Sequence, residues 1–127
     1  MNIHNPFTLP ELEFVGGSTQ ELVFHCYHEQ NGKPTDLSSC TANFSLISYV
    51  NKYGSPLVSK VMEIRAGTDD DDGICNILAV VLEPSDTLEL RGKYIYQIAL
   101  KDVTGLAEVP GQGLFHINNN INKGFIS

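Results

Sequence analysis

The sequence predicts an all-β antiparallel sandwich of about seven strands, and three observations lead to this fold class. Short segments alternate between apolar and polar residues, as strands with one buried face do. Turn signals such as Asn-Gly, Asp-Gly and Pro separate these segments, and no segment shows the pattern of a long helix. Hydrophobic residues make up 42% of the 127 residues and charged residues 18%, which is typical of one folded globular domain.

The stretch 88–100 contains the clearest strand, and its second half alternates without a break. One face carries Tyr94, Tyr96, Ile98 and Leu100, and the other carries Ile95, Gln97, Ala99 and Lys101. This period of two indicates a long strand with one face in a core. We interpret it as the central strand of the sandwich.

The entry to this strand predicts a corner. Residues 84–87 can form one helical turn because Pro84 fixes φ where no backbone donor is needed. Gly92 then lets the chain turn, and Tyr94 follows two residues later. We expect Tyr94 to be buried, with its hydroxyl bonded to backbone within residues 86–90. Such a tyrosine corner is typical of immunoglobulin-like sandwiches, and it makes the predicted fold an immunoglobulin-like one.

The remaining elements follow in chain order. Further strands are predicted at residues 12–15, 20–28, 41–49, 57–66, 74–82 and 114–117. Lys60 lies on the apolar side of its strand, which indicates a strand near the edge of a sheet. We expect an extended N-terminal arm over 1–11, the sandwich over 12–118 and an extended C-terminal tail over 119–127, because Pro6 and Pro10 interrupt pairing and the tail is polar.

The segment 74–82 is apolar on both faces. Leu78, Val80 and Leu82 alternate with Ile77, Ala79 and Val81. Only one of these sets can fill the core, so the other needs a cover. We predict that Ile77, Ala79 and Val81 form an interaction surface for another subunit.

Charge and hydropathy exclude several partners. The formal net charge is −7, from 15 acidic and 8 basic residues, so we expect no nucleic-acid partner and no anionic membrane partner. No apolar run approaches the about 20 residues that span a bilayer. The first residues lack the basic and apolar regions of a signal peptide, so we expect the mature chain to begin there.

The residue types of a zinc site are present, but their spacing does not predict one. Cys26, Cys40 and Cys75 form no C-x2-C pair, and His25 and Cys26 point to opposite faces of one strand. Cys26 and His28 share a face, so a site completed by Cys40 or Cys75 stays open. Buried, reduced thiols are the commoner outcome in a chain without an export signal.

The acidic run 69–72 lacks the alternating ligands, central Gly and distant Glu of an EF-hand. We interpret it as a solvated turn that binds no cation. The sequence also shows no phosphate-binding glycine loop, no Ser-His-Asp arrangement and no reactive Cys-His pair. We therefore expect no metal, no cofactor and no catalytic residues.

The order of segments resembles the immunoglobulin-like domain at the N-terminus of BppU-type phage upper baseplate proteins and related phage virion proteins. The resemblance covers about residues 14–118. It is carried by residues 17–24, 31–37, 82–88, 92–98 and 113–117. The family's helical or fibre-forming continuation is not found before Ser127, which leaves open a neck, tail or head-decoration protein.

The resemblance implies a non-enzymatic structural protein of the virion, assembled in the cytoplasm of the bacterial host. Such a protein would be an adaptor or decoration subunit that docks on other virion proteins in a tail, baseplate, neck or head. The alternative is a carbohydrate- or receptor-binding immunoglobulin-like module that uses the loops at one end of the sandwich.

Overall fold

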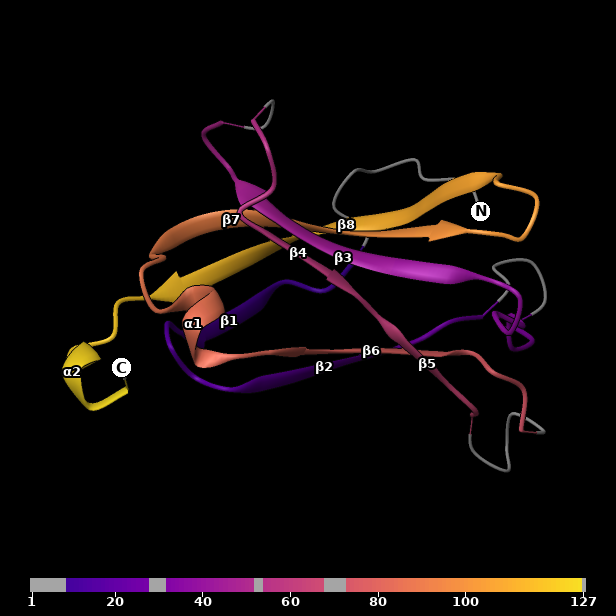
Figure 1. Ribbon diagram of the computed structural model, residues 1–127, viewed down its shortest axis with the longest axis horizontal. Helices are drawn as coiled ribbons and strands as arrows, with labels where there is room; N and C mark the ends of the chain where they lie inside the picture. The colour runs from indigo at the N-terminus through magenta and orange to yellow at the C-terminus, as the bar shows by residue number, and fades with distance from the viewer. Residues whose placement is uncertain (1–8, 28–31, 52–53, 68–72, 127) are drawn as a thin grey trace.

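The computed structural model describes residues 9–27, 32–51, 54–67 and 73–126 of the chain. Within these residues two facing β-sheets form the molecule, which confirms the predicted all-β sandwich (Figure 1). The strands are β1 (Leu12–Val15), β2 (Gln20–His25), β3 (Thr41–Ser48), β4 (Val58–Val61), β5 (Glu63–Arg65), β6 (Ile77–Leu82), β7 (Gly92–Lys101) and β8 (Ala107–Asn118). Two short helices, α1 (Pro84–Thr87) and α2 (Lys123–Ile126), complete the described elements, and neither has the length to cross a bilayer.

The larger sheet has the strand order β1-β8-β7-β3-β4, and the smaller one has the order β2-β6-β5. The predicted central strand, β7, is the middle strand of the five-stranded sheet. The prediction of a wholly antiparallel sandwich is wrong at one edge, where β1 pairs in parallel with β8 from Leu12↔Phe115 to Val15↔Asn118. After β1 the chain crosses to the other sheet as β2 instead of returning as a hairpin. β1 is thus an edge strand of the larger sheet, and its neighbour is the last described strand, β8.

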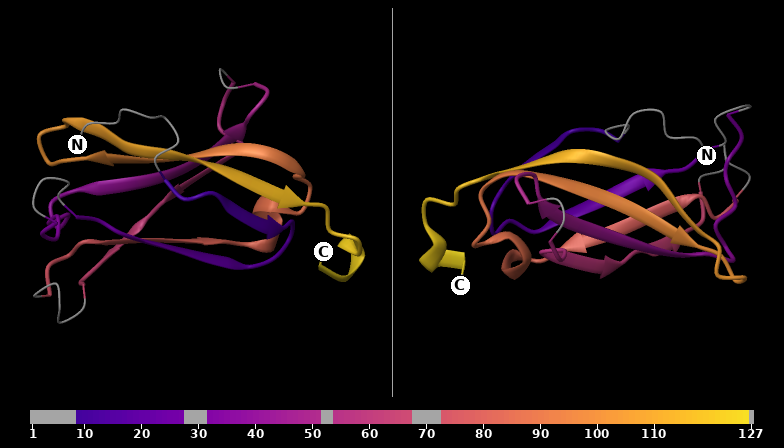
Figure 2. Two further views of the ribbon diagram at one scale, coloured as in Figure 1. Left: turned by 180° about the vertical axis from the view of Figure 1, so that it is seen from behind. Right: turned by 90° about the horizontal axis from the view of Figure 1, so that it is seen from above.

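The predicted strand 57–66 divides between the two sheets. β4 pairs with β3 in the five-stranded sheet, and β5 pairs with β6 in the three-stranded sheet. Met62 lies between them, buried, and its N–H donates to Ala42 O at 2.9 Å. Figure 2 shows this diagonal crossing from both further sides. The division raises the number of described strands to eight, against the expected seven.

Aromatic rings of both sheets meet around Tyr96 in the middle of the core. The Tyr96 ring is fully buried, and its centroid lies 5.8 Å from that of Phe44 and 6.0 Å from that of Phe24. Phe115 packs edge-on against it at 6.1 Å. Because Phe24 comes from β2 and the other rings from the larger sheet, this cluster joins the two layers.

β8 is much longer than the predicted strand 114–117. β8 begins at Ala107 and pairs with β7 along most of its length. Gly113 lies opposite Tyr96 in the register, and a Cβ at Gly113 would lie 2.5 Å from a ring carbon of that tyrosine. The glycine therefore provides room for the central ring of the core.

Both ends of the described chain pack on the sandwich. Leu9 N–H donates to Gln112 O at 3.0 Å, and the Tyr96 hydroxyl donates to Pro10 O. At the other end, Asn120 Nδ2 donates to Gly16 O at 2.8 Å, and the predicted tail contains α2. Residues 1–8 of the predicted arm lie outside the described part, and the proposed division at 11 and 118 stays a prediction.

Candidate functional site

The outer face of β6 was the predicted interaction surface, and the structure corrects it in part. Leu78, Val80 and Leu82 belong to the core. Of the opposite set, Ile77 is 9% exposed, Ala79 2% and Val81 37%. The prediction that this set is open to solvent is therefore wrong for Ile77 and Ala79, and docking through Val81 stays a prediction.

An ion pair across the sheet explains this burial. Arg65 on β5 lies opposite Ile77, and Glu21 on β2 lies opposite Val81. The two guanidinium nitrogens of Arg65 contact both carboxylate oxygens of Glu21 at 3.3 and 3.4 Å. The Arg65 side chain must therefore cross β6 diagonally above Ala79.

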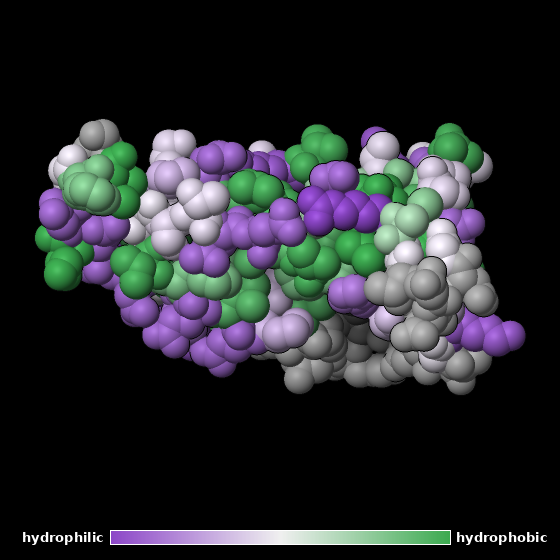
Figure 3. Space-filling view, turned by 90° about the horizontal axis from the view of Figure 1, so that it is seen from below, coloured by the Kyte–Doolittle hydropathy of each residue, from purple (hydrophilic) through white to green (hydrophobic). Residues whose placement is uncertain are grey.

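Glu63 strengthens this cover, because its carboxylate accepts a further hydrogen bond from Arg65 at 3.1 Å. The bonds to Glu63 and Glu21 raise the pKa of Arg65. Figure 3, seen from the side of the three-stranded sheet, shows polar and apolar side chains interleaved on this face. The β6 face is thus no continuous apolar patch.

The Tyr94 ring is buried, and its hydroxyl bonds the backbone of Arg91 in both directions. The hydroxyl donates to Arg91 O at 2.8 Å and accepts from Arg91 N–H at 2.9 Å. This partner lies one residue beyond the expected range 86–90. Within that range the N–H groups of Leu88 and Leu90 already donate to Pro84 O and Thr87 O. The corner closes the turn between α1 and β7.

Exposed apolar side chains gather at the two ends of the long axis. At one end the turn between β7 and β8 carries Val103 and Leu106, and the start of β8 carries Val109; we call these three residues the hairpin patch. At the opposite end Ile121 and Phe125 of the α2 region, 98% and 83% exposed, form what we call the C-terminal patch. Figure 1 shows the β7–β8 turn and α2 at opposite ends of the molecule.

Among the described residues, the three cysteines have no set of neighbouring metal ligands. All three thiols are free and partly buried, and burial raises the pKa of Cys26. A raised pKa lowers the thiolate fraction at neutral pH, which disfavours nucleophilic chemistry. Over the described ranges no three His, Cys, Asp or Glu side chains are placed to hold a metal ion. His28 and the acidic run 69–72 lie outside those ranges.

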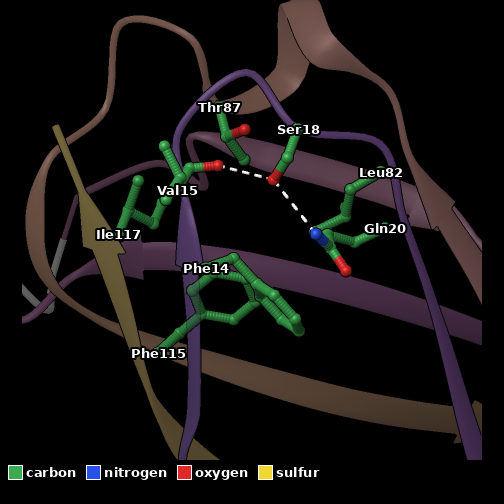
Figure 4. Close-up of a pocket in the computed structure, with 8 residues that line it drawn as sticks. All are labelled: Phe14, Val15, Ser18, Gln20, Leu82, Thr87, Phe115 and Ile117. Atoms are coloured by element: carbon green, nitrogen blue, oxygen red, sulfur yellow. Dashed lines mark hydrogen bonds between the residues drawn. The ribbon is translucent and has the colours of Figure 1, made fainter. Parts of the chain in front are cut away.

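One pocket between the sheets is closed by packing (Figure 4). It is lined by Phe14, Val15, Ser18, Gln20, Leu82, Thr87, Phe115 and Ile117, and it leaves no room for a water molecule. The Ser18 hydroxyl donates to Val15 O at 2.6 Å and accepts from Gln20 Nε2 at 3.1 Å, so its polar groups are paired internally. These contacts hold the β1–β2 connection in place.

A second cavity is open and lies on the outer face of the five-stranded sheet. It has a volume of about 230 Å³ and is lined by Ser45, Ile47, Pro56, Ile95, Gln97 and Gln112. The alternation along β7 predicted Ile95 and Gln97 on its outer face, but it did not predict the cavity. The alternation of Ser45 and Ile47 on β3 beside Ile95 and Gln97 on β7 is the signal that indicates it.

The likeness to known proteins is at the level of the fold. No family model and no curated protein sequence matches the chain. Among solved structures the fold is similar to the "N-terminal domain of phage TP901-1 ORF48", with a TM-score of 0.52 and 11% sequence identity. The alignment covers 91% of this chain and 92% of that one. The chain therefore has the fold of a phage protein domain along nearly its whole length, and membership of the upper baseplate family stays a prediction.

Proposed function

We propose that the chain is a non-enzymatic structural subunit of a phage particle. In this role it is an adaptor or decoration protein that docks on neighbouring virion proteins in a tail, baseplate, neck or head. The observation that carries the proposal is the shared fold with the phage domain, which extends over 91% of this chain and 92% of that one. A match over both whole lengths supports a common module better than a partial one would.

The hairpin patch and the C-terminal patch are the surfaces we assign to docking. Val103 and Leu106 are 81% and 73% exposed, so each patch leaves large apolar side chains in water. Burying such side chains against an apolar surface of another virion protein removes them from water and provides the free energy of docking. Two patches at opposite ends suit a subunit that links two neighbours.

Purified phage particles provide the direct test. We expect mass spectrometry to find the protein at a fixed ratio to the known structural proteins after gradient purification. Its absence from purified particles would contradict the proposal.

Charged substitutions then test the two patches. We expect Leu106→Asp and Phe125→Asp to lower incorporation at least about tenfold, since loss of an anchoring apolar contact costs about 2 kcal/mol or more. Both variants should keep the melting temperature of the unchanged protein, because neither side chain packs in the core. Val81→Asp tests the β6 face in the same way.

Val50→Asp is the matched control, because Val50 is as exposed as the patch residues but lies beyond β3, away from both patches. Normal incorporation of Leu106→Asp and Phe125→Asp would exclude docking through the two ends.

A further inference from the structure

We propose that the cavity on the outer face of the five-stranded sheet is a binding site for a neutral sugar. We call it the outer-face cavity. This role goes beyond virion assembly and does not depend on the two end patches. It also differs from the predicted alternative of a sugar site among the loops, because its walls belong to the strands β3, β7 and β8.

The register of the three strands builds the cavity from two parallel rows. Ser45, Gln97 and Gln112 lie side by side in one row, on β3, β7 and β8. Ile47, Ile95 and Leu114 form the next row in the same strand order. Polar groups therefore stand along one side of the cavity and apolar side chains along the other.

The polar row holds its hydrogen-bonding groups in fixed positions. Gln112 Nε2 donates to Gln97 Oε1 at 2.7 Å, which orients both side chains. This bond uses the oxygen of Gln97 and one N–H of Gln112. The amide group of Gln97 keeps N–H donors, and Gln112 keeps its Oε1 acceptor.

Ser45 adds a second acceptor to this row. Its hydroxyl donates to Asn43 Oδ1 at 2.9 Å, so its oxygen remains able to accept a hydrogen bond. Donors and acceptors thus alternate along the row. Neighbouring hydroxyl groups of a sugar ring, each of which donates and accepts, are the complementary chemistry.

The apolar row suits the other side of such a ligand. Ile95 points away from the core and is nevertheless only 6% exposed, and Ile47 is half-buried beside it. Pro56 closes the margin near β4. Carbon-bound hydrogens on one face of a sugar ring can pack on these aliphatic groups while the hydroxyls at the ring's edge reach the amides.

Charge selects a neutral ligand over a phosphate or a carboxylate. None of the six lining residues is charged. In the next row Lys93 lies 4.3 Å above the ring of Tyr49, and His116 Nε2 is 2.8 Å from Glu11 Oε1. Both basic groups already have partners, so an anion would find no counterion in the cavity.

The volume agrees with one sugar unit. Pockets for drug-sized ligands occupy about 300–1,000 Å³, so a cavity of about 230 Å³ fits a smaller molecule, such as a single ring. A ligand of this size, held by a few hydrogen bonds, binds with a dissociation constant in the millimolar range.

The experiment is a titration of the ¹⁵N-labelled full chain, followed by NMR. The probes are glucose, galactose, rhamnose and N-acetylglucosamine, with glycerol 3-phosphate as a charged comparator. We expect at least one neutral sugar to shift the side-chain amide signals of Gln97 and Gln112 and the backbone signal of Ile95, with millimolar affinity. Glycerol 3-phosphate should leave these signals unchanged.

Gln97→Leu and Gln112→Leu should each weaken sugar binding about fivefold or more, because each removes hydrogen bonds to the ligand. Ser45→Ala is a milder third variant that keeps the packing of β3. Gln20→Leu, on the opposite sheet, is the matched control and should bind as the unchanged chain does.

Three results would overturn the proposal. They are an absence of shifts with all four sugars, shifts confined to other parts of the molecule, and unchanged affinity in a folded Gln97→Leu variant. A shift of the Gln97 and Gln112 signals with a peptide of another virion protein, but with none of the sugars, would instead assign the cavity to protein docking. None of these outcomes bears on incorporation through the end patches, so the two proposals fail separately.

Discussion

Two tyrosines of β7 that lie two positions apart face the same core and hold different parts of the chain. Tyr94 ties its own strand to the turn at Arg91, whereas Tyr96 ties β7 to Pro10, 86 residues away in the sequence. Around Tyr96 the space is so tight that only a glycine fits at position 113. Three predictions follow from these contacts.

Removing the Tyr94 hydroxyl should lower the free energy of unfolding by about 1–2 kcal/mol. In Tyr94→Phe the backbone N–H and C=O of Arg91 both lose their bond to the hydroxyl while the ring still fills its site. Urea denaturation followed by circular dichroism measures the change. A midpoint equal to that of the unchanged chain would show that the hydrogen bonds between Tyr94 and Arg91 do not contribute to stability.

Adding one methyl group at Gly113 should lower the free energy of unfolding by about 1–3 kcal/mol, the usual cost of overpacking. The new Cβ would overlap the buried Tyr96 ring, which has no room to retreat among three other aromatic rings. Gly124→Ala is the control, because its nearest neighbour would lie 3.9 Å away. Equal stability of the two variants would contradict the tight contact.

Burial raises the pKa of Tyr96 above its ordinary value of 10.0. The folded state therefore keeps this proton while the unfolded chain loses it, so the contribution of Tyr96 to stability is constant below about pH 10 and falls as the pH rises further. Urea titrations at several alkaline pH values measure the slope. We expect Tyr96→Phe to show a shallower decline, and an identical slope would exclude Tyr96 as its source.

At the scale of elements, the β4–β5 segment connects the two sheets along their edges. The chain passes from one sheet to the other at Met62, and the side chain of this residue lies in the core. Lys60, the charged residue that indicated an edge strand, extends its Nζ to Asp86 Oδ2 at 2.5 Å and to Val81 O at 3.1 Å. It therefore joins the edge of the larger sheet to α1 and to β6.

Met62→Ala should lower the free energy of unfolding by about 2–5 kcal/mol, because it leaves a cavity where the strand changes sheets. Val61→Ala is the matched control at the preceding residue, where the side chain is 79% exposed, and it should be nearly neutral. Chemical denaturation measures both variants. A loss as small in Met62→Ala as in Val61→Ala would show that the crossing is loosely packed.

At the scale of the whole molecule, the two sheets share an aromatic cluster and a crossing segment, and Lys60 at the edge of the larger sheet contacts α1 and β6. Neither sheet can open without exposing the core of the other. We expect a single cooperative unfolding transition, with far-ultraviolet circular dichroism and tyrosine fluorescence giving the same midpoint. Two separated midpoints would indicate sheets that unfold independently.

Much of this architecture could be predicted because alternation reports which side chains face the core. The inward positions of β7 and the helical turn at 84–87 are as the sequence indicated, since both depend on local patterns. The division at Met62 could not be predicted, because both sheets face the same core and the alternation continues through the crossing. The length of β8 was missed because Gly113, in the middle of the strand, accommodates a ring that belongs to a different strand.

The surfaces were harder to predict than the core. Ile77 and Ala79 looked open because the sequence shows no link between Arg65 and Glu21, which lie 44 positions apart. The outer-face cavity depends in the same way on the register of three strands. Pairings between distant residues decide both surfaces, and a single sequence does not reveal them.

The parallel pairing of β1 with β8 also sets the order of events during synthesis. β1 leaves the ribosome about a hundred residues before its partner exists, which at about 5–20 residues per second is a wait of roughly 5–20 s. During that time Leu12 and Phe14 have no strand to cover them in their final position. β1 has only four residues, and Glu11 and Glu13 place charges beside Leu12 and Phe14, which discourages pairing with other nascent chains. β1 is thus suited to remain unpaired until β8 has been made.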